Sequence, residues 1–215
     1  MSNRRISLRA RDHARSLDRA RLLIVPGLHN SGPLHWQSWL QSQYPDAVRV
    51  EQDDWTAPDL DTWAHRVGLA LERNGEGPWL AVAHSFGCLA LVRHLVLRLD
   101  PSISCLKAAL LVAPADPESF GAAHKLPHTK LRVPTTLVAS ETDPWMRAQT
   151  AQLWAQRWGS NWLNLGDAGH INSASGHGPL PFAQQWVRAW VDDRNADPSQ
   201  LAADRNRVPS AFSLP

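Results

Sequence analysis

The chain has 215 residues, of which 43% are hydrophobic and 20% are charged, and its formal net charge at pH 7 is +2. This length can bury one sizeable core, and the composition is that of an ordinary globular domain. No apolar run approaches the ~20 residues of a membrane-spanning helix, and the N-terminus lacks the apolar segment of a secretory signal. We therefore expect a globular protein that does not bind or span a membrane.

The positive charge is concentrated at the N-terminus. Residues 1–21 hold seven arginines and two aspartates, a net charge of +5, so the rest of the chain carries −3. An acidic body is a poor surface for nucleic acid, and we expect no nucleic-acid partner. Residues 1–20 are predicted to form a flexible arm. Organelle targeting is the alternative, and Asp12 and Asp18 weigh against it.

Apolar runs alternate with amphipathic segments in the first half of the chain. Residues 21–27 form an apolar run that ends in Pro-Gly, which predicts a buried strand and a turn. Residues 31–45 have the apolar spacing of a helix, and residues 47–52 predict a second strand. A helix is then expected over 59–75, with Asp at its start and Gly at its end, before a strand over 79–85.

The second half continues the alternation up to residue 193. The expected order is helix, strand, strand, helix, strand, helix, over residues 86–99, 106–115, 135–143, 144–159, 161–166 and 181–193. The fourth of these begins with Pro144 at the first helical position and ends at Gly159. About six apolar strands alternating with helices predict a single α/β domain over residues 21–193, with a parallel sheet covered by helices on both faces. Residues 194–215 are polar, which predicts a loose tail.

The sequence Ala83-His84-Ser85-Phe86-Gly87 joins the third predicted strand to a helix. A strand-turn-helix segment of this kind exposes a serine hydroxyl above the sheet and needs small residues on both sides, here alanine and glycine. Ser85 is therefore the candidate nucleophile, and the N–H of Phe86 is a candidate oxyanion-hole donor. The alternative is that Ser85 only caps the helix. His84 is expected to point away from the serine, and either to pack or to support a catalytic side chain without itself reacting.

Candidate partners for the serine follow two later strands. Asp143 comes after the fifth predicted strand and His170 after the sixth, and ligands bind parallel sheets at the carboxyl ends of their strands. The chain order Ser, Asp, His is the order that this fold uses for an acid that orients a base. Asp116 is an alternative acid and His177 an alternative base.

The loop after the first strand is the expected source of the second oxyanion-hole donor. Gly27 allows a close approach of the chain, and the backbone N–H of Leu28 is the candidate donor. The alternative is a plain strand-to-helix turn in which Asn30 and Ser31 cap the helix that follows.

A small pocket walled by loops is expected around these residues. Only about twenty residues separate Pro114 from Pro134, which is too few for a large cap domain. His35, Trp55 and Trp145 are candidates to line the pocket and bind substrate. Packing in the core is the alternative for these residues, and the 11 tryptophans of the chain favour it except for Trp145, which is close to the candidate acid in sequence.

Neither a metal nor a cofactor is expected. A metal site built from histidines is conceivable, but no ligand spacing supports it; its members would be His29, His35, His170 and His177. The two cysteines, Cys88 and Cys105, belong to no CxxC pair or metal pattern. They are interpreted as small apolar side chains of a reduced, cytoplasmic protein.

Five segments resemble the small serine hydrolases of the α/β-hydrolase superfamily that include retinoblastoma-binding protein nine and the YdeN-like proteins. These segments are VPGLHNSGPLHWQSWL (25–40), DDW (53–55), AHSFG (83–87), SETDP (140–144) and GHINSASGHGPLP (169–181). The resemblance covers roughly residues 21 to 191 and implies a compact, nearly lid-less hydrolase. It implies the roles of nucleophile, acid and base for Ser85, Asp143 and His170. The chain lacks the L-x-C-x-E motif of retinoblastoma binding, so that role is not carried over.

The leading hypothesis is a metal-free serine hydrolase that cleaves small carboxylic esters through an acyl-enzyme. Amides, thioesters and aminoacyl esters are further substrate classes for the same residues. The alternatives are a non-enzymatic binding protein on a hydrolase fold and an acyltransferase that uses the same triad. The expected partner is a small-molecule ester or amide, bound by a monomer or small homo-oligomer.

Overall fold

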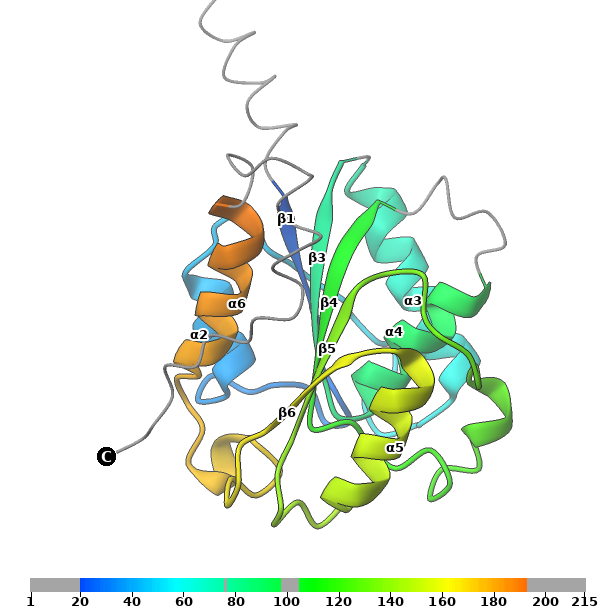
Figure 1. Ribbon diagram of the computed structural model, residues 1–215. Coiled ribbons are helices and arrows are strands. Elements are labelled where there is room, and N and C mark those ends of the chain that lie inside the picture. Colours follow the sequence, from blue (N-terminus) through cyan, green and yellow to red (C-terminus); the bar gives the residue numbers. More distant parts are fainter. Residues whose placement is uncertain (1–19, 76, 98–104, 193–215) are drawn as a thin grey trace, which may run out of the picture.

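A computed structural model describes residues 20–75, 77–97 and 105–192 of the chain (Figure 1). Apart from Ala20, the predicted N-terminal arm over residues 1–20 and the predicted tail over 194–215 lie outside the described residues. The described part contains the whole of the predicted sheet and the helices that cover it.

Six parallel strands form one sheet, as the alternating pattern predicts. The strand order is β2-β1-β3-β4-β5-β6. The strands are β1 (Arg21–Val25), β2 (Val48–Arg49), β3 (Trp79–His84), β4 (Leu106–Val112), β5 (Thr135–Ala139) and β6 (Asn161–Asn164). Most strands predicted from the sequence end several residues later than the observed strands. The residues beyond the observed ends form the loops that carry the candidate site.

Five helices of the described residues cover both faces of the sheet (Figure 1). Helices α2 (Trp36–Ser42) and α6 (Pro181–Asp192) lie on one face. Helices α3 (Leu60–Arg73), α4 (Phe86–Leu97) and α5 (Ala148–Trp158) lie on the other. Alternate strand residues point to opposite faces, so the sheet separates the buried apolar residues into two clusters. This is the predicted α/β architecture.

The start of α5 differs from the prediction. Pro144 was expected at the first helical position, but the helix begins at Ala148 after Arg147. The Asp143 carboxylate accepts a hydrogen bond from the N–H of Trp145 at 2.9 Å, a turn that competes with helix formation. The end of α5 is as predicted, because Gly159 ends the helix in the left-handed conformation.

The connection from β4 to β5, residues 113–134, contains one short 3₁₀ helix, η2 (Ala123–Lys125), and no cap domain. None of the helices in the described ranges combines the length and apolar character needed to cross a membrane.

The first turn of α4 lies directly against the end of β1. A Cβ atom built on Gly87 would lie 2.3 Å from the carbonyl oxygen of Pro26 and 2.6 Å from that of Val25. Both neighbours are backbone atoms, which cannot move aside as a side-chain end can. Gly87 therefore permits the approach of β1, β3 and α4 on which the site is built.

We predict that Gly87→Ala lowers the free energy of unfolding by about 3 kcal/mol, because overpacking must displace backbone. Gly32→Ala is the matched control, since a Cβ there meets no atom within 4 Å; its effect should stay within ~0.5 kcal/mol. Urea denaturation measures both. Equal stability of the two variants would contradict the close approach.

Candidate active site

Ser85 lies in a sharp turn between β3 and α4. It has φ of 53°, in the left-handed region that residues with a side chain seldom occupy. Its N–H donates to the carbonyl of Val112 on β4 at 3.2 Å, and its carbonyl accepts from the N–H of Cys88 at 3.0 Å. These bonds and the adjoining strand and helix hold the strained turn, which leaves the serine hydroxyl partly exposed at the carboxyl edge of the sheet.

The loop after β1 packs against this turn. A Cβ atom on Gly27 would lie 2.7 Å from Cβ of Ser85 and 3.3 Å from its Oγ. Glycine is therefore required at position 27 for the loop to reach the serine, as the sequence predicted. Ala83, on the other side of the turn, is fully buried.

Ser85, His170 and Asp143 form a continuous hydrogen-bonded relay. Ser85 Oγ lies 3.0 Å from His170 Nε2, and His170 Nδ1 lies 2.9 Å from each carboxylate oxygen of Asp143. A carboxylate only accepts, so Nδ1 carries the proton and Nε2 is free to accept from the serine hydroxyl. The Asp143 side chain is 2% exposed, which shields this pair from water.

The two alternative residues lie elsewhere. Asp116 accepts a hydrogen bond from the N–H of Glu118 at 3.1 Å and so caps a turn after β4. His177 follows a short 3₁₀ helix, η3 (Ser173–Ser175), and its N–H donates to the Asn172 carbonyl at 2.9 Å. The structure brings Asp143, not Asp116, to His170.

Two hydroxyl side chains join the loop of the acid to the loop of the base. Ser140 Oγ accepts from the N–H of Ala168 at 3.0 Å, and Thr142 Oγ1 accepts from the N–H of Gly169 at 2.9 Å. These bonds fix the loop after β5, which carries Asp143, against the loop after β6, which carries His170. Neither hydroxyl was predicted from the sequence, where its only signal is a position directly after a strand.

Two buried histidines lie behind His170. The His84 ring centroid is 4.8 Å from that of His170 and 4.8 Å from that of His35. Burial lowers the pKa of His84 well below its ordinary value, with His170 and His35 adding to the effect. Burial, assisted by Arg49, lowers the pKa of His35 from 6.5 to about 4. Both rings are therefore neutral at neutral pH.

His35 has a structural position at the start of α2. Its Nδ1 accepts a hydrogen bond from the N–H of Gln37 at 3.1 Å, so His35, and not Asn30 or Ser31, caps this helix. The residue is only 5% exposed. It was predicted to line the pocket, but so little of its surface is accessible that it can offer a ligand almost no contact.

One candidate oxyanion-hole donor, Phe86, directly follows Ser85, and the other, Leu28, follows Gly27, which approaches Ser85. Among the hydrogen bonds of the described residues, the N–H groups of Leu28 and Phe86 have no protein acceptor. The loop after Leu28 has two residues in the left-handed region, His29 at φ of 64° and Asn30 at φ of 62°. Arg49 holds this loop, since its guanidinium donates to the Asn30 side chain at 2.8 Å.

The two tryptophans proposed for the pocket differ in exposure. Trp145 is 60% exposed, and its ring centroid lies 6.3 Å from that of His170. Trp55 is half-buried and packs edge-on against Trp63 at 5.8 Å. Trp145 therefore offers an apolar surface beside the relay, whereas much of Trp55 belongs to the core.

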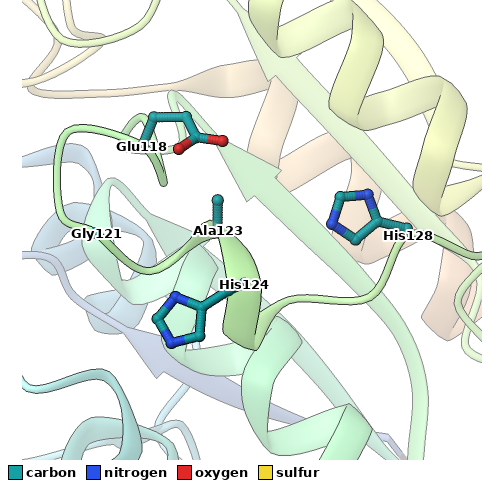
Figure 2. Close-up of a pocket in the computed structure, with 5 residues that line it drawn as sticks. All are labelled: Glu118, Gly121, Ala123, His124 and His128. Atoms are coloured by element: carbon teal, nitrogen blue, oxygen red, sulfur yellow. The ribbon is translucent and has the colours of Figure 1, made fainter.

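A separate cavity of about 350 Å³ lies on the connection between β4 and β5 (Figure 2). It is lined by Glu118, Gly121, Ala123, His124 and His128. Figure 2 shows the His128 ring well apart from Glu118 and His124, so the polar groups do not converge. Within the described part of the chain, no three His, Cys, Asp or Glu residues gather as metal ligands would.

A serine at the β3–α4 turn, with an aspartate after β5 and a histidine after β6 of a parallel sheet, is the arrangement of an α/β hydrolase. A family model described as serine hydrolase matches residues 22–189. The chain belongs to this serine hydrolase family. No curated protein sequence matches the chain.

Solved structures agree with this assignment. The chain is 32% identical to a YdeN-like hydrolase from Pectobacterium atrosepticum, with a TM-score of 0.76 over 87% of this chain and 97% of that one. The ydeN gene product of B. subtilis is 19% identical, with a TM-score of 0.66 over 80% of this chain and 99% of that one. Mouse alpha/beta hydrolase domain-containing protein 10 is 13% identical, with a TM-score of 0.61 over 80% and 90%. The last two likenesses show the fold alone.

We predict that His35→Asn makes stability less sensitive to acid. Because the folded-state pKa of His35 is about 4, the unfolded chain binds more protons than the folded chain between that value and 6.5. Stability therefore falls as the pH falls through this range. Asparagine keeps a capping acceptor but does not titrate. In the variant, the free energy of unfolding should therefore change less with pH, by up to ~1.4 kcal/mol per pH unit.

Urea unfolding at about pH 7.5 and about pH 5 measures this difference between the wild type and the variant. Identical slopes would mean that His35 already titrates normally in the folded protein.

Proposed function

We propose that this protein is a metal-free serine hydrolase that cleaves small carboxylic esters through an acyl-enzyme formed on Ser85. The observation that carries the proposal is the relay from Ser85 through His170 to the buried Asp143. A serine hydroxyl at its ordinary pKa is a weak nucleophile, and a hydrogen-bonded base with an oriented ring is what activates it. No metal is needed to generate this nucleophile.

The proposed reaction has two halves. His170 Nε2 takes the hydroxyl proton while Ser85 Oγ attacks the ester carbonyl, and Asp143 stabilises the imidazolium that forms. The tetrahedral intermediate then collapses, the C–O bond to the leaving group breaks, and His170 returns the proton to the departing alcohol. In the second half, His170 takes a proton from water, the water attacks the acyl-enzyme, and the carboxylic acid leaves as Ser85 regains its proton.

The oxyanion of each tetrahedral intermediate is assigned in this proposal to the N–H groups of Leu28 and Phe86. Leu28 follows Gly27, which approaches Ser85, and Phe86 follows Ser85 itself; neither N–H donates to another acceptor of the described chain. A preorganised pair of donors of this kind contributes 10²- to 10³-fold per donor in related chemistry.

Small substrates are favoured by the surroundings of the relay. The connection between β4 and β5 carries no cap domain, and Trp145 is the exposed apolar side chain beside His170. Short acyl groups packed on an indole would suit such an open site. Amides, thioesters and aminoacyl esters undergo the same acyl transfer and belong to the same proposal.

The proposed compartment is the cytoplasm. Cys88 is a buried free thiol, and disulfides are typical of oxidising compartments. A small-molecule ester is the proposed partner, bound by a monomer or small homo-oligomer.

A fluorophosphonate probe tests the proposed nucleophile. We expect the purified wild type to be labelled, and Ser85→Ala and His170→Ala to remain unlabelled. With a short-chain p-nitrophenyl ester, Ser85→Ala should lose turnover by on the order of 10⁶-fold. A wild type that is folded but takes no label and hydrolyses no ester would favour a binding protein on a hydrolase fold.

The two aspartates form a matched pair that tests the acid. Asp143→Asn should lower kcat by about 10⁴-fold, because an amide in place of the carboxylate favours the wrong tautomer of His170. Asp116→Asn should leave kcat within ~2-fold, since Asp116 contacts a turn and not the relay. Steady-state ester hydrolysis measures both, and a larger loss in the Asp116 variant would reverse the assignment.

A further inference from the structure

The residue before the nucleophile contacts the backbone of the base. His84 Nε2 lies 3.0 Å from the carbonyl oxygen of His170, and a carbonyl only accepts, so the imidazole donates this bond. His84 is 5% exposed, and its ring packs against the rings of His35 and His170. One side chain from the end of β3 thus touches both the ring and the main chain of His170.

The main chain around His170 is strained and requires such support. Ile171 has φ of 46°, and a β-branched side chain is rarely found in this left-handed region, which Gly169, at φ of 55°, adopts without strain. A strained backbone persists only where surrounding contacts over-determine it. Trp36 supplies a second contact, because its indole Nε1–H donates to the Ile171 carbonyl at 2.8 Å. The carbonyls of His170 and Ile171 are therefore each held by a buried donor.

The charge of the His84 ring matters as much as its hydrogen bond. The ionisable groups that face it are His170 and His35, and burial keeps its pKa well below the ordinary value. A neutral ring donates to the carbonyl without placing a positive charge beside the imidazolium that forms on His170. A lysine or arginine donor would oppose that charge.

We propose that His84 is a positioning residue for the base. By donating to the His170 carbonyl, it sets the orientation in which His170 Nε2 faces Ser85 Oγ and Nδ1 faces Asp143. This inference rests on the proposed function of Ser85 and His170, and it assigns to His84 an effect on the chemical step and not on substrate binding.

Two variants of His84 separate the hydrogen bond from packing. His84→Phe keeps an aromatic ring and removes the donor, whereas His84→Gln keeps an N–H donor of similar reach. His94→Phe makes the same change at another buried histidine, on α4 beside Gly68, and controls for a loss of stability alone. If His84→Phe does not fold, His84→Met replaces it, since methionine adapts to a gap and has no donor.

The first readout is the rate of fluorophosphonate labelling, with kcat and KM for a p-nitrophenyl ester. Leaving a buried carbonyl without its donor should slow labelling and lower kcat by about 10- to 100-fold in His84→Phe. KM should stay within ~3-fold, and His84→Gln should recover most of the rate. His94→Phe should label at the wild-type rate.

The second readout needs no activity. The Nδ1 proton that His170 donates to Asp143 gives a downfield ¹H NMR signal, which should remain in His84→Gln and be lost or broadened in His84→Phe. If the wild type takes no label but the NMR signal still differs between the two variants as described, the proposed function is overturned and the positioning role is supported. If His84→Phe is labelled at the wild-type rate and keeps the NMR signal, the positioning role is overturned. An equal loss of labelling rate in His84→Phe and His84→Gln would overturn it as well.

Discussion

The close approach of three backbone segments around Ser85 is the constraint on which the site depends. The loop after β1, the end of β3 and the first turn of α4 meet where Gly27 and Gly87 leave no room for a Cβ atom. Ser85 takes a left-handed conformation within this contact. The serine hydroxyl is partly exposed because the chain reverses there, and the parallel sheet and the helix on either side support this reversal.

Buried polar side chains then hold the loops that this contact brings together. Gln37 is fully buried in α2, and its amide donates to the carbonyls of Val25 on β1 and Val82 on β3. Arg49 on β2 holds the loop that contains Asn30. Each of these groups satisfies a backbone or side-chain acceptor that would be costly to bury alone. The polar interior of this protein is concentrated at the carboxyl edge of the sheet.

The separation of the relay residues in the sheet explains why the loops need such support. Ser85 follows β3, while Asp143 and His170 follow β5 and β6, with β4 between them. The loop after β6 must therefore extend back across the sheet edge to bring His170 within 3.0 Å of Ser85. Ser140 and Thr142 hold one side of this loop, and His84 and Trp36 hold the other.

The sequence by itself determined the fold class and the candidate relay. Apolar strands alternating with amphipathic helices specify a parallel sheet, and residues at the carboxyl ends of such strands share one edge. Position and chain order thus sufficed to select Ser85, Asp143 and His170. The residue type also predicted helix ends such as Gly159, because few residue types other than glycine adopt the left-handed conformation that ends a helix.

Only the tertiary structure decided how each side chain is used. His35 was expected to face a ligand and is a buried helix cap, and Pro144 was expected in a helix that begins at Ala148. Gln37 and Arg49 look like surface residues in sequence, because helix and strand periodicity does not encode which distant carbonyl a side chain will meet. Such contacts join residues far apart in the chain, as Trp36 and Ile171 do, and exist only once the sheet has brought its loops to one edge.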